Sequence, residues 1–488
     1  MSGFDGLPRE ADGAAWLPET VAWLWRALGP DLWRRAYNAG YAPPRNHAQL
    51  GELLDLRGMA WRDQARALEG RLTRSMLDEV AFLSAASDEA RAINHVRFLV
   101  ALDRACDGLA LGAPRIAPHL EAMLARRDER GSLAPASELI VMRRAAPNPP
   151  GGAALGYYLA NLAVLDPASL GGYGIAVPAL PDACRLATRP GGPGLRIGFV
   201  PVLREAGHVR LRPVQVGSDP RFTIELDAAH QASVARGARA LVARLEEARV
   251  HIALLPETCV HPEVAEALRA ALISNYAAAD GDPHLRLLLV GVLAARRNEV
   301  RALSGAGHRL VVQSKQQPWR LDLRQQRRYG VVDDLCGDGP PVDRDEDLEL
   351  EARRISALDD PGFGRLIVLI CEDLQRCDPA RRIAVDIGPT TVVAPVMDYA
   401  LRADRWAAAA AAQLAVEPGA RVLVVSSASL TALARRDGGV HPWPPGVGWV
   451  ASPSYPEQLE LVARLPVTVA EGEEFSVLEL APLPTGPG

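Results

Sequence analysis

Three residues whose side chains could together attack a carbonyl carbon each follow a short apolar run. Glu257 comes after HIALLP, Lys315 after RLVVQS and Cys371 after RLIVLI. A carboxylate can take the proton of a thiol, the thiolate can attack an amide or nitrile carbon, and an ammonium can stabilise the oxyanion that develops. A thioester is then left for water to open. The three residues therefore predict thiol-dependent cleavage of a carbon–nitrogen bond.

Lys315 is the single lysine among the 54 basic residues of the chain, and the other 53 are arginines. Arginine is a bulky planar fork that resists deprotonation, whereas lysine is a compact ammonium with three rotatable donors. Where only a surface cation is needed, this chain uses arginine. Lys315 is therefore either a chance exception or fills a place that needs an ammonium. Its occurrence together with Glu257 and Cys371, each after an apolar run, favours the second interpretation.

The elements that must position these residues follow from the spacing of apolar residues after residue 194. Apolar runs of strand length alternate with amphipathic segments, which is typical of an α/β domain with its functional residues at the carboxyl ends of strands. The pattern predicts strands over 195–203, 251–258, 285–294, 365–371, 390–396 and 421–428, a hairpin over 299–315, and helices over 228–248, 262–277 and 403–416.

The chain before residue 195 has a different character. Residues 1–145 place apolar side chains at intervals of three and four, which predicts an all-α domain of unknown role without a chemical motif. Residues 146–194 are rich in proline and glycine and are predicted to be a connector. We therefore expect three parts, with the chemistry in 195–488.

The order LLPE, then a glycine-containing hairpin that ends in Lys315, then LICEDL resembles the nitrilase superfamily of carbon–nitrogen hydrolases. The resemblance covers about 195–480. It implies a four-layer α-β-β-α sandwich, here preceded by the all-α domain. The tripeptide at 371–373 is most similar to the glutaminase-type domain of glutamine-dependent NAD synthetases.

The resemblance also implies roles for single residues. Members of the superfamily use a Glu-Lys-Cys triad, so Glu257 matches the general base, Lys315 the lysine that stabilises the oxyanion, and Cys371 the nucleophile. The backbone N–H of Glu372, directly after the nucleophile, matches a second oxyanion donor. Nitrilase-fold proteins commonly form dimers, so the resemblance implies a homo-oligomer.

One departure from the family concerns a second acid. Many members carry another glutamate between the lysine and the cysteine, and in the NAD synthetase branch it falls about eleven residues after the lysine. This chain has Gln326 there. A glutamine can hold a substrate amide or a water but cannot share a proton. Three outcomes stay open: altered substrate handling, replacement by another acid such as Asp322, or weak activity.

Two further segments differ from the family. Residues 333–351 hold nine acids, and such runs are typically solvated loops, with a lid over the pocket as the alternative. After the strand at 390–396, Met397, Asp398 and Trp406 replace the usual Ser/Asn-rich end and are candidates for substrate contact. Ordinary packing is the alternative for Met397 and Trp406.

Composition limits the partners. A net charge of -5 and an isoelectric point near 6.1 give no support for a nucleic-acid partner. The six cysteines form no CxxC pair and the ten histidines have no metal spacing, so neither a disulfide framework nor a metal or other cofactor is expected, and Cys259 and Cys377 are interpreted as packing thiols. The longest apolar runs are too short to span a bilayer, and no signal peptide is visible. We expect a cytoplasmic protein that does not enter a membrane.

The leading hypothesis is an amidase-like hydrolase acting on a small amide through a thioester on Cys371. A glutaminase-type module that hands ammonia to a separate partner is a variant of it. The chain has no SGGxDS loop of an ATP-pyrophosphatase, so that partner would have to carry out the synthesis. The alternative from another class is a weak or inactive hydrolase fold used as a regulatory or interaction module. In that case the N-terminal helical domain would offer the surface for a protein partner.

Overall fold

The chain divides into two compact units. The computed structural model describes residues 15–16, 20–28, 71–83, 88–105, 140–143, 159, 162–165, 173–176 and 194–480, the last range with gaps at 217–218, 281, 337–338, 351–352, 361–363, 377–381, 399–400, 402–404, 417–418, 437–445, 454–461 and 470–472. One unit holds Met1–Ser169, Asp386–Gly388 and Thr485–Gly488, and the other holds Leu170–Val385 and Pro389–Pro484. The division after Ser169 falls inside the predicted connector, most of which lies outside the described residues.

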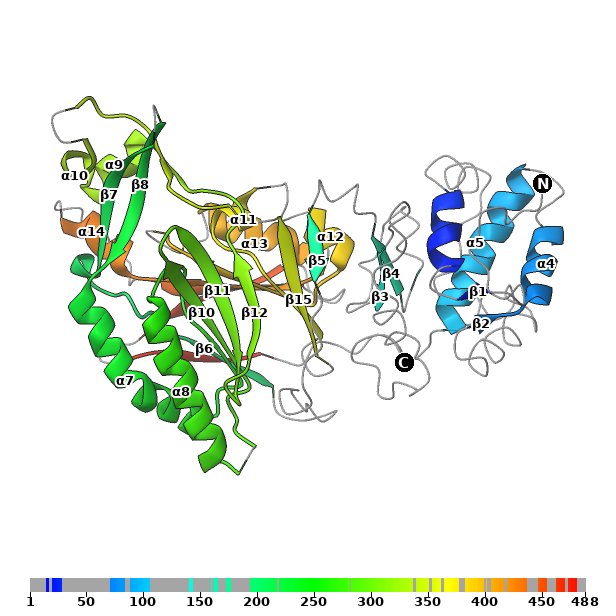
Figure 1. Cartoon of the computed structure of the whole chain (residues 1–488), viewed down its shortest axis with the longest axis horizontal. Coiled ribbons are helices and arrows are strands. Elements are labelled where there is room, and N and C mark those ends of the chain that lie inside the picture. Colours follow the sequence, from blue (N-terminus) through cyan, green and yellow to red (C-terminus); the bar gives the residue numbers. More distant parts are fainter. Residues whose placement is uncertain are drawn as a thin grey trace. The chain divides into compact units, whose positions relative to one another are not determined.

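The N-terminal unit contains both helices and strands. Helices cover 20–28, α4 (Arg74–Leu83) and α5 (Asp88–Ala105), while β1 (Ala15–Trp16) pairs with β2 (Arg71–Leu72) and β3 (Ile140–Arg143) with β4 (Leu162–Leu165), both antiparallel (Figure 1). The buried carboxylate of Asp103 accepts a hydrogen bond from the N–H of Leu162 at 2.8 Å. The prediction of an all-α domain is therefore not confirmed. The strands were not visible in the sequence, because two to four residues are too few to show an alternating pattern.

The larger unit is built on two main sheets. The first has the order β12-β11-β10-β9-β6-β21, with β9 parallel to β6 and β10 and the other pairs antiparallel. Its strands are β6 (Leu195–Phe199), β9 (Ile252–Leu254), β10 (Leu287–Ala294), β11 (Arg297–Ser304), β12 (Arg309–Ser314) and β21 (Ser476–Leu480), and its helices are α7 (Ala228–Glu247) and α8 (Pro262–Ala278). Asp227 caps α7 by accepting from the N–H of His230.

The second sheet has the order β20-β19-β18-β17-β16-β15-β5, and β16, β17 and β18 are parallel. Its strands are β5 (Gly174–Ala176), β15 (Arg354–Asp360), β16 (Gly364–Val368), β17 (Thr391–Val396), β18 (Arg421–Ser426), β19 (Gly446–Pro453) and β20 (Val462–Thr468). Helix α13 (Trp406–Val416) packs on β18 and β19, and the short helix α11 (Glu372–Gln375) follows β16.

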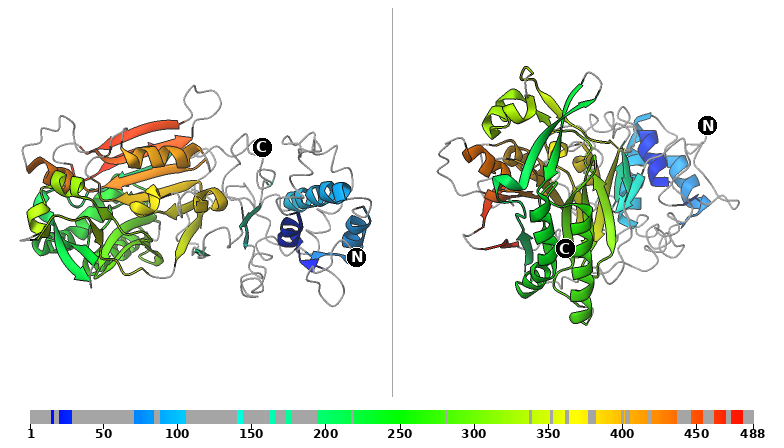
Figure 2. Two further views of the ribbon diagram at one scale, coloured as in Figure 1. Left: turned by 90° about the horizontal axis from the view of Figure 1, so that it is seen from above. Right: turned by 60° about the vertical axis from the view of Figure 1, so that its left-hand side comes forward.

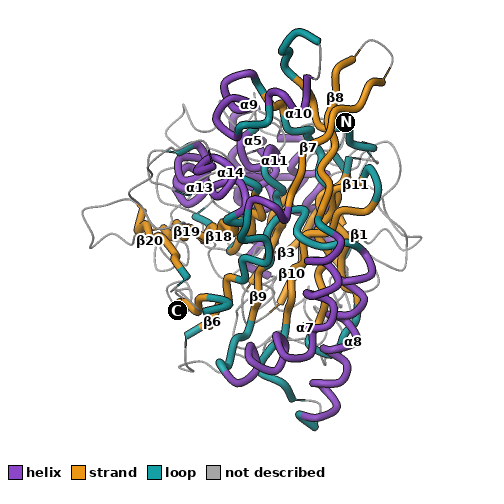
Figure 3. Tube along the Cα trace, turned by 90° about the vertical axis from the view of Figure 1, so that its left-hand side faces the viewer, coloured by secondary structure: helices purple, strands orange, loops and turns teal. Residues whose placement is uncertain are grey.

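Two neighbouring residues of β6 show how the layers are stacked. A Cβ placed on Gly198 would lie 3.2 Å from the side chain of Leu245 on α7, whereas a Cβ on Gly448 of β19 would lie 2.6 Å from the ring of Phe199. Because successive strand residues point to opposite faces, α7 covers one face of the first sheet and the second sheet covers the other. In the left view of Figure 2 the orange helix α13 lies against the orange strands of the second sheet, and Figure 3 shows α7 and α8 side by side. The α/β class is confirmed, and the layers agree with the expected sandwich.

A third, four-stranded sheet has the order β13-β14-β8-β7. It consists of β7 (Val209–Val216), β8 (Asp219–Leu226), β13 (Arg320–Leu321) and β14 (Arg344–Glu346), with helices α9 (Leu323–Tyr329) and α10 (Val332–Cys336) in the connection between β13 and β14. The prediction of a solvated loop over 333–351 is wrong for its central part. Residues 344 and 346–348 are buried, and the carboxylates of Glu346 and Asp347 form ion pairs inside this part of the protein, Glu346 with Lys315 and Asp347 with Arg221 and Arg296.

The predicted strands before the candidate residues are shorter in the structure. The strand expected over 251–258 ends at Leu254, and the one expected over 365–371 ends at Val368. Glu257 and Cys371 consequently stand in turns rather than in strands. The remaining short elements are η3 (Ala206–His208), α12 (Arg382–Ile387) and α14 (Ser429–Arg436). None of the described helices is both long enough and apolar enough to cross a membrane.

Candidate active site

The turn after β9 holds Glu257 against β10. A Cβ on Gly291 would lie 1.8 Å from the carbonyl oxygen of Pro256, so only glycine permits this approach. The N–H groups of Cys259 and Val260 both donate to the carbonyl of Gly291, at 3.1 and 3.2 Å. The turn is thereby fixed, and the carboxylate of Glu257 is almost fully buried.

The turn after β16 presents Cys371 in a strained conformation. Its φ is 48° and its ψ is -103°, which a residue with a side chain rarely adopts, and such strain is concentrated at functional sites. The N–H of Cys371 donates to the carbonyl of Pro395 at 3.0 Å. The buried carboxylate of Asp373 accepts from the N–H of Ile370 at 3.4 Å and from that of Gln316 at 3.0 Å, which ties this turn to the residue after Lys315.

Lys315 lies between two carboxylates. Its Nζ donates to Oε1 of Glu257 at 2.7 Å and to Oε2 of Glu346 at 2.6 Å, and all three side chains are at most 4% exposed. An ammonium has three N–H donors, and these two bonds are its hydrogen bonds within the described part of the chain. One N–H therefore remains for a ligand.

Glu346 is the residue that the sequence analysis missed. It stands on β14 inside the acidic segment, and its Oε2 also accepts from the N–H of Trp319 at 3.1 Å. Glu346 is hidden in the sequence by the run RDED. Every residue of this run is charged, so the alternation of polar and apolar residues that marks a half-buried strand is not visible. Burial itself alternates, with Arg344 and Glu346 buried and Asp345 exposed between them. Glu346, rather than Gln326 or Asp322, is thus the second carboxylate that contacts Lys315.

Asn298 on β11 joins the two carboxylates. Its Nδ2 donates to Oε1 of Glu257 at 2.7 Å and to Oε1 of Glu346 at 3.2 Å, and its backbone carbonyl accepts from the N–H of Lys315 at 2.8 Å. Oε2 of Glu257 is buried and has no hydrogen-bond partner among the described residues. One oxygen of Glu257 is thus saturated and the other is open.

The charges around the cluster decide the resting protonation. Burial alone would lower the pKa of Lys315, but Glu257 and Glu346 together raise this pKa well above its ordinary value of 10.5. Burial raises the pKa of the Cys371 thiol well above 9.0 and Glu257 raises it further, while Lys315 opposes the shift. The resting site therefore contains an ammonium and a neutral thiol, and the thiol needs a base at the moment of attack.

The structure brings two more of the predicted residues to the nucleophile. The backbone of Met397 makes a hydrogen bond to Cys371, and the hydroxyl of Thr258 lies 3.8 Å from the sulfur of Met397. Glu372 begins α11 directly after Cys371, and its side chain forms an ion pair with Arg376 at 3.5 Å. Met397 is buried, as the packing interpretation expects, and the prediction that it contacts a substrate stays a prediction.

Three other predicted residues make their hydrogen bonds elsewhere. The amide of Gln326 donates to the carbonyls of Leu321 and Val342 rather than engaging Lys315. Asp322 caps α9 by accepting from the N–H of Gln325 at 2.7 Å, so it does not replace the missing acid. Asp398 is buried and pairs with Arg405 at 2.7 Å. Gln326 and Asp322 therefore organise backbone around α9.

The cysteine beside Glu257 behaves as predicted. Cys259 is fully buried, its thiol donates to the carbonyl of Gly291 at 3.3 Å, and burial raises its pKa far above the ordinary value. Cys377 lies outside the described residues. Within the part of the chain that the structure describes, no group of three or more His, Cys, Asp or Glu side chains is arranged to hold a metal ion.

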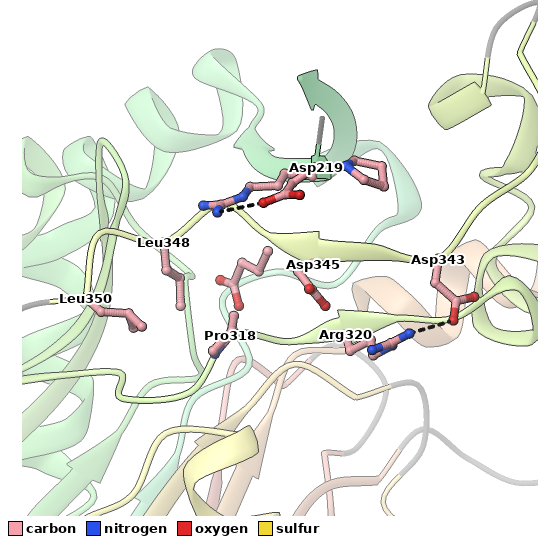
Figure 4. A pocket seen from close by; sticks show the side chains of 10 residues that line it. Asp219, Pro318, Arg320, Asp343, Asp345, Leu348 and Leu350 are labelled. Atoms are coloured by element: carbon pink, nitrogen blue, oxygen red, sulfur yellow. Dashed lines mark hydrogen bonds and ion pairs between the residues drawn. The ribbon is translucent and has the colours of Figure 1, made fainter. Parts of the chain in front are cut away.

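A cavity of about 340 Å³ opens beside Glu346 (Figure 4). Leu348 and Leu350 lie on one side of it and the ion pair of Arg320 with Asp343, at 3.2 Å, on the other. Glu346 is the residue that this cavity shares with the buried cluster. The cavity is lined by Asp219, Pro220, Arg221, Pro318, Arg320, Asp343, Asp345, Glu346, Leu348 and Leu350.

Comparisons with known proteins find similarity among solved structures. No family model matches the chain, and no curated protein matches its sequence. Nit3 of Saccharomyces cerevisiae, a member of branch 10 of the nitrilase superfamily, is 12% identical with a TM-score of 0.35 over 60% of this chain and 91% of its own. An amidase from Nesterenkonia sp. AN1 in complex with butyramide is 16% identical with a TM-score of 0.35 over 60% of this chain and 92% of its own.

A glutamine-dependent NAD+ synthetase from Acinetobacter baumannii is also similar, at 11% identity and a TM-score of 0.37 over 60% of this chain. The match covers 48% of that protein, so the chain spans about half of its length. Solved structures to which this chain is similar thus include a member of the nitrilase superfamily, an amidase and a glutamine-dependent synthetase.

Proposed function

We propose that the protein is a thiol-dependent hydrolase that cleaves a non-peptide carbon–nitrogen bond of a small amide-type substrate. The observation that carries the proposal is the convergence of Glu257, Lys315 and Cys371. Lys315 is hydrogen-bonded to Glu257, and both act electrostatically on the thiol of Cys371. These three side chains come from turns and strand ends that are far apart in sequence.

In the proposed first step, Sγ of Cys371 attacks the carbonyl carbon of the amide. Because the resting thiol is neutral, Oε2 of Glu257 takes its proton as the carbon–sulfur bond forms. The negative charge that develops on the carbonyl oxygen is stabilised by the remaining N–H of Lys315. The N–H of Glu372, at the first position of α11 and without an intrahelical partner, supplies the second donor.

In the second half of the proposed reaction, the tetrahedral intermediate breaks its carbon–nitrogen bond. Glu257 returns the proton to the leaving nitrogen, and ammonia or an amine departs. Water then attacks the thioester with Glu257 again as the base, and the carboxylic acid and the free thiol of Cys371 are released. Lys315 stays an ammonium throughout, which its two carboxylate partners support.

Glu346 is proposed to be the second acid of the site. It accepts a second hydrogen bond from Lys315 beside the one to Glu257, so the ammonium is fixed in position and keeps its charge. The cavity beside Glu346 is not lined by Glu257, Lys315 or Cys371, so the proposed attack on the amide does not rest on it. Met397 is proposed to contact the bound amide, since its backbone already touches Cys371.

The proposal is tested by incubating the protein with simple amides, nitriles, carbamoyl compounds and glutamine while ammonia or amine release is followed. Intact mass with fluoroacetamide then detects a covalent adduct, and the Cys371→Ala variant is the control. We expect release from at least one compound and an adduct that the variant lacks. Neither release nor a Cys371-dependent adduct across the panel would contradict the proposal and favour the interaction-module alternative.

A further inference from the structure

We infer that Asn298 is a positioning residue that decides which oxygen of Glu257 acts as the base. The inference rests on the proposed function, because it assigns a role within the same site. Asn298 is 2% exposed and lies on β11, next to β12, which ends one residue before Lys315. Its amide contacts both acids of the cluster, and its backbone carbonyl contacts Lys315.

The charge of the cluster explains why an amide is required. Glu257 and Glu346 together carry two negative charges, and Lys315 supplies one positive charge in a place closed to water. Buried charge that is left over must be met by hydrogen-bond donors. The amide nitrogen of Asn298 has two N–H groups and no charge, so one group reaches each carboxylate. An aspartate of the same size would add a third negative charge instead.

The orientation of the amide follows from its neighbours. With Nδ2 toward the carboxylates, Oδ1 of Asn298 is buried and has no partner among the described residues. Turning the amide over would bring Oδ1 against Oε1 of Glu257 and Oε1 of Glu346, where oxygens repel each other. The carboxylates therefore hold the amide in one orientation, although this leaves an acceptor unsatisfied.

The consequence for Glu257 is an asymmetry between its two oxygens. The terminal torsion of a glutamate is broad and roughly two-fold, so a carboxylate held by one donor can exchange its oxygens easily. Oε1 of Glu257 receives Lys315 at 2.7 Å and Asn298 at 2.7 Å, from two directions. Oε2 is left without a donor. Asn298 thus keeps Oε2 ready for the proton of Cys371.

The test compares two buried amides on neighbouring strands. Asn298→Leu removes both hydrogen bonds to the carboxylates. Gln313→Leu on β12 removes an amide that is equally buried but bonds to the backbone of Ser314, Arg354 and Ser356. The kcat and KM of both variants are measured against pH with the best substrate of the panel. The rate of Cys371 alkylation by iodoacetamide is followed over the same pH range.

We expect Asn298→Leu to lower kcat about 10- to 100-fold with little change in KM. Its activity and its alkylation rate should also need a higher pH, because a carboxylate that loses a donor holds its proton to higher pH. Gln313→Leu should change stability without moving either pH profile. Asn298→Ser, which is smaller and fits without a clash, serves if the leucine variant does not fold.

Two outcomes overturn the inference: an Asn298 variant that keeps the wild-type pH profiles, or a Gln313 variant that shifts them equally. The alkylation experiment separates this inference from the proposed function. If no compound is turned over but the alkylation profile shifts in the Asn298 variant, Asn298 still positions Glu257 and the hydrolase proposal fails. If turnover is found and the profiles do not move, the hydrolase stands and Asn298 is only structural.

Discussion

The turns after β9 and β16 are similar in composition but differ in what they do with their cysteines. Each contains a glutamate, a buried cysteine and a residue with positive φ. After β9 the positive φ of 44° falls on Thr258, and Cys259 packs against Gly291. After β16 the positive φ of 48° falls on Cys371 itself, whose thiol is under the influence of Lys315.

The difference teaches that burial does not identify a nucleophile. Burial raises the pKa of both thiols, so a buried thiol with a raised pKa describes Cys259 as well as Cys371. What separates them is the backbone, which turns Cys371 toward a cation and a base. The strain of that conformation lies at the residue that the chemistry needs.

The largest expected effect comes from removing each thiol in turn. Cys371→Ala should lose turnover to background, because the thioester cannot form, and should keep or raise the melting temperature. Cys259→Ala should keep most of its turnover and lose about 1 kcal/mol of stability with its packing and hydrogen bond. Assays of activity and thermal unfolding check both. Equal losses of activity in the two variants would contradict the distinction between Cys371 as the nucleophile and Cys259 as a packing residue.

Lys315→Arg is expected to lose roughly 100-fold or more in turnover, the scale seen when a preorganised oxyanion donor is displaced. The guanidinium is too large for a place where Nζ lies 2.7 and 2.6 Å from two carboxylate oxygens. Elsewhere in this chain arginine serves as the cation, so a merely electrostatic role would tolerate the change. Near-normal kcat in this variant would show that Lys315 does not stabilise the oxyanion.

Glu346→Gln is expected to lower kcat about 10- to 100-fold, because one of the two carboxylate charges that hold Lys315 is removed. Asp345→Asn is the matched control, since it removes a neighbouring carboxylate on the exposed face of the same strand. Its turnover should stay within about 2-fold of wild type. Similar losses in both variants would mean that the charge of the segment, rather than the contact with Lys315, matters.

The smallest expected effect concerns the side chains that pin the two turns. Gln231 donates to the carbonyl of Cys259 at 3.1 Å and accepts from His261, whereas the turn of Cys371 is held by Asp373. Burial raises the pKa of Asp373 from 3.8 to about 7. The folded state therefore holds this proton to higher pH than the unfolded chain, and the associated stability is full below pH 3.8 and is lost as pH rises through about 7.

Asp373→Asn removes this titration, so its melting temperature should fall less than that of wild type between pH 4 and pH 8. Gln231→Ala should lower the melting temperature by a similar amount at every pH, because its amide does not titrate. Thermal unfolding across that range measures both. If the Asp373 variant keeps the wild-type dependence of melting temperature on pH, Asp373 is not the source of that dependence.

Much of this site could be predicted from the sequence, because its motif residues follow apolar runs whose pattern is visible. Glu257, Lys315 and Cys371 were found in this way, and the structure brings the first two into direct contact. Glu346 could not be found, since a strand made of charged residues shows no alternation of polar and apolar side chains. Asn298 was hidden for a related reason: its role depends on two carboxylates that lie 41 and 48 residues away.

Lys315 gives the protein an unusual reactivity toward reagents for amines. It carries the only side-chain amine of the chain, and it is 2% exposed and held as an ammonium. A reagent that acylates amines can therefore modify the side chain of Lys315 only when the site opens. The extent of acylation at Lys315 thus measures how often this side chain becomes exposed. A protease that cuts only after lysine has one recognition position in the chain, and the folded protein keeps that position closed.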